Sequence, residues 1–229
     1  MTVTQNVDEK QSVLNRKDIE YMGTPVKVTF LYLFIKRCFD IVCALAALIL
    51  LSPLLLTVSL CIFLYDFGSP IYKQERIGLN GKKISIYKFR SMRKNADKLE
   101  DFFTPEQLEE YYKEFKIDND PRITPFGKFI RKTSIDELPQ LLNILSGTLS
   151  VVGPRPIVEK ELEKYGDAVD ILLSVKPGLT GYWQAYARND AQYEDCVRQK
   201  MEITYVYKRS LIFDIKIIFK TFTRVFKGG

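Results

Sequence analysis

The longest apolar run of the chain, Ile41 to Leu64, predicts a membrane-inserted helix. It exceeds the ~20 apolar residues that a membrane-spanning helix needs. Ser52-Pro53 lies at its centre, and proline removes a helix hydrogen bond and clashes with the preceding turn, so we expect a bend there. The pattern fits a spanning helix kinked at its proline, and equally a re-entrant helix that leaves by the face through which it entered. The positive-inside rule does not decide whether the helix crosses the membrane, because basic residues flank both of its ends. They are Lys27, Lys36 and Arg37 before the run, and Lys73, Arg76, Lys82 and Lys83 after it.

Two runs rich in isoleucine and tyrosine follow, Ile71 to Ile77 and Lys83 to Phe89, and they flank Asn80-Gly81. Asn-Gly between such runs is the strongest short-range signal for a β-hairpin. Lys88 and Arg90 alternate at the end of the second run, so we expect both cations on one face. That face could be an exposed basic edge that discourages aggregation.

The C-terminal segment, Leu211 to Phe226, is amphipathic at helical spacing. A wide aromatic and aliphatic face opposite Lys and Arg suits a helix in the membrane interface, although a helix packed on the core has a similar pattern. The apolar face holds Leu211, Ile215, Ile218, Phe219, Phe222 and Phe226, and the polar face holds Lys216, Lys220, Thr223, Arg224 and Lys227.

Three more segments have helical patterns: 95–115 in two pieces, 157–175 and 193–207. Together these elements predict a mostly helical α+β protein. The expected division is a polar N-terminal tail over 1–29, a membrane-inserted helix over 30–67 that is broken at Ser52-Pro53, a compact globular domain with the hairpin over 68–210, and the interfacial helix over 211–229.

Composition narrows the chemistry that such a domain can perform. The net charge of +6 with 46% hydrophobic residues suits an anionic membrane surface, nucleic acid or phosphorylated ligands, and no nucleic-acid-binding motif supports the second of these. The chain has no histidine, which excludes Ser-His-Asp and Cys-His nucleophiles and His-ligated zinc. The four cysteines have no metal-ligand or disulfide spacing, as expected in a reducing compartment.

Charged residues concentrate in the stretch from Thr124 to Pro156. Ser134 and Glu137 have the spacing of a capping box before an apolar helical run, which places Asp136 in the first turn. Acidic residues often open helices for structural reasons alone. Here, however, cations surround the pair, so the segment could also hold an anionic substrate that a carboxylate attacks: Lys128, Arg131 and Lys132 precede it, and Arg155 follows.

Three motifs carry a resemblance that covers the chain from about Lys36 to its C-terminus. They are the stretch from Thr124 to Pro156, Lys88-Phe89-Arg90-Ser91-Met92, and Pro177-Gly178-Leu179-Thr180-Gly181-Tyr182-Trp183-Gln184. In their order along the chain they resemble the bacterial sugar transferase family, the monotopic phosphoglycosyl transferases that begin the assembly of lipid-linked glycans. Ala187 departs from the family pattern, in which a Gly or Ser is more usual before the next arginine.

The resemblance implies transfer of a hexose 1-phosphate from a UDP-sugar to undecaprenyl (polyprenol) phosphate, with release of UMP, as the first step of capsular, exopolysaccharide or other surface glycan synthesis. It also favours the re-entrant helix, since the Lys-Arg-x-x-Asp start and the Ser-Pro break are family features. Lys36 and Arg37 would then lie at the lipid headgroups, with a catalytic domain on the cytoplasmic face of the bacterial membrane. A homo-oligomer is possible, and no nucleic-acid partner is expected.

The resemblance also assigns roles to single residues. Asp136 would be the nucleophile that forms an aspartyl-phosphosugar intermediate, and Glu137 would assist by holding Mg²⁺ (or Mn²⁺) with Asp136 or by accepting a proton. Trp183 could stack on a nucleobase or simply pack in the core.

Two other classes of protein remain open: a glycosyltransferase, which would release UDP, and a non-catalytic membrane-anchored scaffold. The expected phosphate or metal-site contacts come from Lys88, Arg90, Arg131, Arg155 and Arg188.

Overall fold

The computed structural model describes residues 14–15, 19–20, 24–114, 117, 119–187 and 196–226. Helices dominate this part of the chain, in agreement with the expected class. The α-helices are α2 (Phe30–Asp66), α3 (Pro105–Glu114), α4 (Pro125–Lys132), α5 (Gln140–Ser146), α6 (Val169–Leu173), α7 (Tyr182–Tyr186), α8 (Val197–Lys208) and α9 (Leu211–Phe226). The strands are β1 (Ile71–Ile77), β2 (Lys83–Phe89), β3 (Ser150–Val152) and β4 (Gly178–Thr180), and 3₁₀ turns are η1 (Leu79–Gly81), η2 (Leu99–Asp101), η3 (Ile135–Glu137) and η4 (Glu159–Ala168).

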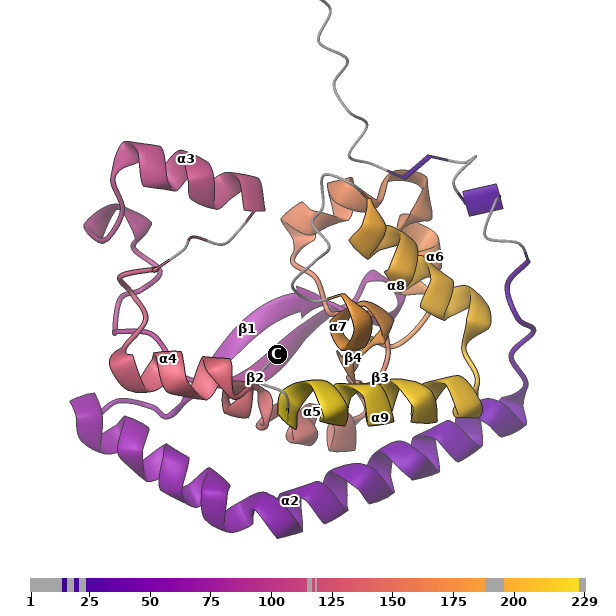
Figure 1. Cartoon of the computed structure of the whole chain (residues 1–229), viewed down its shortest axis with the longest axis horizontal. Coiled ribbons are helices and arrows are strands. Elements are labelled where there is room, and N and C mark those ends of the chain that lie inside the picture. Colours follow the sequence, from indigo (N-terminus) through magenta and orange to yellow (C-terminus); the bar gives the residue numbers. More distant parts are fainter. Residues whose placement is uncertain are drawn as a thin grey trace, which may run out of the picture.

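Helix α2 forms the base of the molecule and bends near its middle, so both arms rise toward the globular part (Figure 1). The bend expected at Ser52-Pro53 is present, but the helix is not broken there and continues through Pro53. Proline has no N–H to donate to the carbonyl of Ile49, one turn earlier. The Ser52 hydroxyl donates to that carbonyl instead, at 2.8 Å. The serine therefore satisfies the acceptor that the proline leaves open, and the helix bends without ending.

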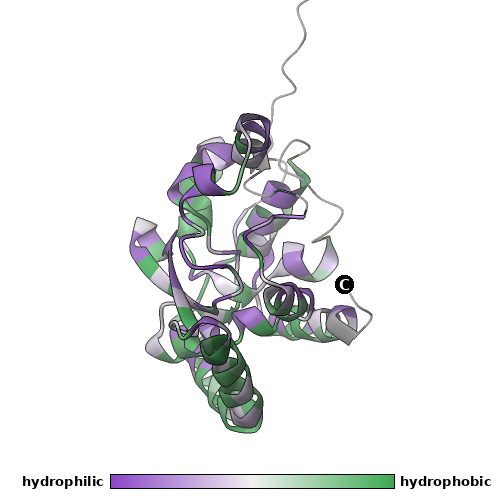
Figure 2. Cartoon of the chain, turned by 90° about the vertical axis from the view of Figure 1, so that its left-hand side faces the viewer, coloured by the Kyte–Doolittle hydropathy of each residue, from purple (hydrophilic) through white to green (hydrophobic). Residues whose placement is uncertain are grey.

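One face of α2 packs against the globular part, and the opposite face is exposed. In the first arm Ala44 contacts a cluster with Ile144, and in the second arm Val58 and Ile62 contact Phe89 and Ile130. In the most apolar stretch of α2 only 11% of the residues are buried. By length and composition, α2 is the one helix of the described part that could cross a membrane. The base of the molecule is accordingly the most hydrophobic part in Figure 2.

The basic start of α2 attaches the helix to the globular part. The Arg37 guanidinium donates to the carbonyls of Ile144 and Leu145, at 2.6 and 2.8 Å, and so caps the C-terminus of α5. Lys36 Nζ lies 2.7 Å from a carboxylate oxygen of Asp214 on α9 and also donates to the backbone. The described contacts of both side chains lie within the protein, and their expected position at the lipid headgroups stays a prediction.

The hairpin agrees with its prediction, strand for strand. Strands β1 and β2 are antiparallel, with Ile71 opposite Phe89 and Ile77 opposite Lys83. In the connection Asn80 and Gly81 have φ of 55° and 75°. Both values lie in the left-handed region that Asn and Gly tolerate best, which explains why this dipeptide marks the turn.

A second sheet, which the sequence pattern did not predict, joins two glycine-containing turns. Strands β3 and β4 are parallel, with Ser150 opposite Gly178. The two backbones approach so closely that a Cβ on Gly178 would lie 2.1 Å from the Gly153 nitrogen. The Gly178 N–H donates to the Pro154 carbonyl at 2.8 Å. This contact places the Gly153–Pro156 turn beside the start of the Pro177–Gln184 motif.

The prediction of a helix over 157–175 is wrong for the middle of that segment. Residues Glu159–Ala168 form 3₁₀ structure, and Gly166 interrupts it with φ 49° and ψ −125°, which is not helical. Only α6 follows as α-helix. The 3₁₀ segment and α6 pack on α8 through a core that includes Tyr165, Leu172 and Ile203. Leu14, from the predicted polar tail, is buried in the same cluster. Most of that tail lies outside the described residues.

Helix α9 confirms its predicted bounds and exposes much of its apolar face. Asp214 and Ile217 are buried against the domain. The exposed large side chains of α9 are Ile212, Ile215, Phe219 and Phe222. Since Asp214 binds Lys36, the exposed apolar surfaces of α2 and α9 belong to one connected part of the molecule.

Candidate active site

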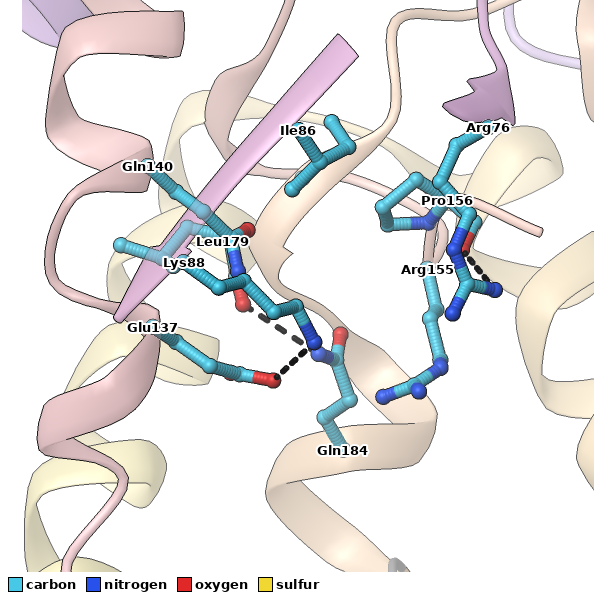
Figure 3. Close-up of a pocket in the computed structure, with 10 residues that line it drawn as sticks. Arg76, Ile86, Lys88, Glu137, Gln140, Arg155, Pro156, Leu179 and Gln184 are labelled. Atoms are coloured by element: carbon cyan, nitrogen blue, oxygen red, sulfur yellow. Dashed lines mark hydrogen bonds and ion pairs between the residues drawn. The ribbon is translucent and has the colours of Figure 1, made fainter. Parts of the chain in front are cut away.

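The separate sequence motifs meet at one pocket (Figure 3). It holds about 270 Å³ of empty space, part of it open to solvent. Lys88 comes from β2, Glu137 from η3, Arg155 from the turn after β3, and Gln184 from α7. The parallel β3–β4 pair brings the last two together. The lining residues are Arg76, Ile86, Lys88, Glu137, Gln140, Arg155, Pro156, Gly178, Leu179 and Gln184.

The carboxylate pair lies on a tight turn of its own. Ser134 has φ 56°, an uncommon left-handed conformation for a residue with a side chain, and the 3₁₀ turn Ile135–Glu137 follows it. The predicted capping box is wrong: the Ser134 side chain makes no capping hydrogen bond, and its carbonyl accepts the Glu137 N–H at 3.2 Å. Pro139 explains the difference, because it has no N–H for an α-helical bond to the Ile135 carbonyl.

Lys88 faces this turn. Its Nζ lies 3.4 Å from Glu137 Oε1, and both side chains are largely buried. Burial lowers the pKa of Lys88; Glu137 and Asp136 oppose the shift, while the positive charges of Arg155 and Arg76 add to it. The Lys88 ammonium is therefore held at a largely buried position beside Glu137, with the guanidinium groups of Arg155 and Arg76 close enough to act on it.

Asp136 has a different environment from its neighbour. Its residue is 8% exposed, and it does not line the pocket, whereas Glu137 does. Its charge still acts on Lys88. The structure thus places the two predicted carboxylates at one edge of the site, with Glu137 presented to the cavity and Asp136 beneath the surface.

Arg155 reaches the pocket from a rigid turn. Its guanidinium points into the cavity in Figure 3, on the side opposite Lys88 and Glu137. The guanidinium lies 6.0 Å from the centre of the Trp183 ring, and Arg198 stacks on the same ring at 4.3 Å. Trp183 is buried, which favours the packing role over base stacking. Nε of Arg155 is buried and makes no hydrogen bond within the described part of the chain.

Two of the predicted cations lie elsewhere. Arg90 pairs with Asp66 at the end of α2, where Lys94 also donates to the Asp66 carbonyl at 2.8 Å. Arg131 Nε donates to Ser91 Oγ at 2.8 Å and does not line the pocket. Arg188 lies outside the described residues, so its expected phosphate contact stays a prediction.

The contact that holds α4 beside this site gives a stability prediction. An added Cβ on Gly127 would lie 1.9 Å from the Ser91 carbonyl oxygen, which is backbone and cannot rotate away. We therefore expect Gly127→Ala to destabilise the fold by about 3 kcal/mol, measured by chemical denaturation in detergent. Gly81→Ala is the comparison, because nothing lies within 4 Å of its added Cβ, although its φ of 75° adds some strain. Equal unfolding free energies for wild type and Gly127→Ala would contradict the contact.

Sequence reasoning missed several lining residues. Arg76 had been noted only as a cation near the apolar run; it lies 3.2 Å from Glu161 and 2.9 Å from Gln74. Gln184 is the last residue of the Pro177–Gln184 motif, and its place in that motif was the only sequence signal that could have identified it as a site residue. Its Nε2 donates to the Leu179 carbonyl at 3.2 Å, while its buried Oε1 has no hydrogen bond within the described residues. That oxygen can accept from a ligand.

Carboxylates are the potential metal ligands at this site. Within the described residues, no three side chains of Asp, Glu, Cys or His gather as metal ligands. Mg²⁺ is commonly held by one or two carboxylates together with substrate phosphates. Of the two predicted ligands only Glu137 faces the cavity, so the expected Mg²⁺ site at Asp136 and Glu137 stays a prediction.

Comparison with known proteins identifies the family. A family model described as bacterial sugar transferase matches residues 31–228. Undecaprenyl-phosphate galactose phosphotransferase from Salmonella typhimurium is 48% identical over 196 residues, which cover 82% of this chain and 40% of that protein. Exopolysaccharide production protein ExoY from Rhizobium meliloti is 47% identical over 193 residues, with 83% and 84% covered. UDP-glucose:undecaprenyl-phosphate glucose-1-phosphate transferase from Escherichia coli K12 is 39% identical over 204 residues, with 85% and 40% covered. This chain belongs to the bacterial sugar transferase family.

Proposed function

We propose that this protein transfers a hexose 1-phosphate from a UDP-sugar to undecaprenyl phosphate and releases UMP, as the first step of a surface glycan such as an exopolysaccharide or a capsule. The observation that carries the proposal is the pocket in which Glu137 faces Lys88, with Arg76 and Arg155 on the other wall. Phosphoryl transfer depends mainly on alignment and charge neutralisation, and this donor set supplies both. The names of the Salmonella and Escherichia relatives describe the same kind of transfer, which supports the proposal.

In the proposed first step, a carboxylate oxygen of Asp136 attacks the phosphorus that bears the sugar. The bond from this phosphorus to the oxygen of UMP breaks, and UMP leaves with the electron pair. A phosphate oxygen of the lipid then attacks the same phosphorus and releases Asp136, which gives the polyprenyl diphosphate sugar. Because Asp136 is buried without substrate, its carboxylate must turn toward the cavity that Glu137 lines.

The other residues bind and orient. Lys88, Arg76 and Arg155 would hold phosphate oxygens, Arg155 by two parallel bonds where its planar guanidinium allows. Asp136 and Glu137 would hold Mg²⁺ or Mn²⁺, which neutralises phosphate charge when bound. Glu137 would also accept a proton from the acceptor phosphate, a role that its position facing the cavity supports.

The exposed apolar surface of α2 and α9 supports membrane association, and we propose that the protein lies on the cytoplasmic face. The two helices are joined by the Lys36–Asp214 ion pair, so they would enter the bilayer together. The bend of α2 favours the re-entrant arrangement, in which both arms stay in one leaflet. The pocket would then lie near the headgroups, where a lipid phosphate can reach it.

Two native thiols can test the arrangement of α2. Cys38 and Cys61 are exposed, one on each arm, and lie 23 residues apart. In a re-entrant helix, spin labels at the two sites should show similar depths in the bilayer. A straight spanning helix would separate them by about 35 Å along its axis. Depth is measured from collisional relaxation with oxygen and a nickel chelate, one label at a time, in variants with the other cysteines changed to serine. Labels in opposite leaflets would contradict the re-entrant proposal.

The reaction itself is tested by product analysis. With a UDP-sugar and Mg²⁺ but no lipid, about one equivalent of UMP should appear together with a phosphosugar adduct on the protein. Adding undecaprenyl phosphate should discharge the adduct and restore turnover. Release of UDP would identify a glycosyltransferase, and no release from a panel of UDP-sugars would support the scaffold alternative.

A further inference from the structure

A buried carboxylate that the proposed reaction does not use lies behind Arg155. Glu202 on α8 is 1% exposed, and its Oε2 accepts the Arg155 backbone N–H at 2.9 Å. Its other oxygen, Oε1, is buried without a hydrogen bond in the described residues. The charged groups that act on it are Arg198, Arg155 and Glu161. Burial is the largest effect, and it raises the pKa of Glu202 to about 7.

The hydrogen bond from Arg155 holds a turn that has few other donors. Pro154 and Pro156 flank Arg155 and have no N–H, so the Arg155 amide is the only backbone donor of this tripeptide. The Pro154 carbonyl accepts from Gly178 at 2.8 Å. Glu202 therefore fixes one side of the turn, and the β3–β4 contact fixes the other.

The side chain of Arg155 has less support of its own. Its Nε makes no described hydrogen bond, and the Trp183 ring is 6.0 Å away. With few described contacts of its own, the guanidinium reaches into the pocket only as far as the position of the Arg155 backbone allows. Burying a carboxylate costs free energy unless its oxygens accept hydrogen bonds. Glu202 accepts one from the backbone of an arginine that faces the pocket, which suggests that it supports the site.

We propose that Glu202 is a positioning residue for Arg155: its carboxylate holds the Pro154–Pro156 turn so that the Arg155 guanidinium faces the phosphates of the nucleotide. The inference rests on the sugar-phosphate transfer proposed above. Glu202 touches neither substrate nor reacting atoms, and acts through the backbone of Arg155.

Two substitutions at Glu202 separate the effect of side-chain length from the effect of its charge. Glu202→Asp keeps the charge but shortens the side chain, so the acceptor is drawn away from the Arg155 N–H. Glu202→Gln keeps the reach and an acceptor oxygen but removes the charge. We expect Glu202→Asp to raise KM for the UDP-sugar about tenfold, with a smaller change in kcat, while Glu202→Gln stays within about twofold of wild type. The reverse order would overturn the proposal.

A double-mutant cycle shows whether the effect passes through Arg155. In an Arg155→Gln background, Glu202→Asp should cause no further rise in KM. A tenfold rise in both backgrounds would mean that Glu202 supports the fold generally, and would overturn the proposal. Circular dichroism checks that each variant is folded. If Glu202→Asp does not fold, the comparison of Glu202→Gln with wild type decides: a tenfold rise in KM for Glu202→Gln would overturn it.

UDP binding, measured by calorimetry, gives a readout that does not require turnover. Kd for UDP should follow the same order as KM across the variants. If wild type binds UDP but releases no UMP from any UDP-sugar, the proposed function fails, and the binding comparison still tests Glu202. If wild type releases UMP and Glu202→Asp binds UDP like wild type, only the positioning role fails.

Discussion

Asp136→Asn is expected to lower UMP release by at least about a thousandfold. An amide is a far poorer nucleophile than a carboxylate, so neither the burst of about one equivalent of UMP nor the phosphosugar adduct should form. The measurement combines rapid-quench analysis of UMP with intact-protein mass spectrometry after mixing with a UDP-sugar and Mg²⁺. Asparagine has nearly the same shape as aspartate, so the buried turn after Ser134 should keep its fold.

Glu137→Gln is the matched comparison, since it changes the adjacent carboxylate in the same way. We expect it to slow turnover while an adduct still forms. The comparison distinguishes the two carboxylates as nucleophiles, because Glu137 lines the pocket whereas Asp136 is buried. If Glu137→Gln abolished the adduct and Asp136→Asn did not, the nucleophile would be Glu137. Normal turnover of Asp136→Asn would exclude Asp136 from that role.

The second large effect concerns the attachment of α2. Lys36→Met should destabilise the protein by about 3–5 kcal/mol, because it leaves the Asp214 carboxylate buried without its cation. The two side chains are 15% and 4% exposed, and the Tyr205 hydroxyl donates to Asp214 at 2.8 Å. Denaturant unfolding in detergent, followed by the fluorescence of Trp183, measures the change.

Two further variants test the cause of this loss. Lys36→Met combined with Asp214→Asn should recover part of the lost stability, since the buried charge is then removed. Lys216→Met is the control, because Lys216 is exposed on the same helix as Asp214. If Lys36→Met and Lys216→Met had equal unfolding free energies, the Lys36–Asp214 pair would not hold α2 and α9 together.

Elements with strong local signals could be predicted from the sequence. Asn80-Gly81 between alternating runs gave the hairpin, and the apolar run and the amphipathic C-terminal segment gave α2 and α9. The β3–β4 pair could not be predicted in this way. Its strands have three residues each, too few to show a period, and they pair across a separation set only by the tertiary fold.

The site was predictable in its residue types more than in its arrangement. Lys88, Glu137 and Arg155 line one pocket, as their motifs suggested. Arg90 pairs instead with Asp66, a residue that no spacing rule connects to it. The capping box at Ser134 failed because a proline five residues later prevents the helix from forming there. Glu202 had no local signal at all, since its partner lies on another element.

The bend of α2 also has a consequence for the lipid around it. A helix whose two arms stay in a single leaflet would add cross-sectional area to that monolayer and none to the opposite one. Such a wedge relieves tension where the monolayer is loosely packed or convex, and compresses lipids where it is tightly packed. The serine that keeps this helix continuous through Pro53 would therefore also preserve a preference for membrane regions under low lateral pressure.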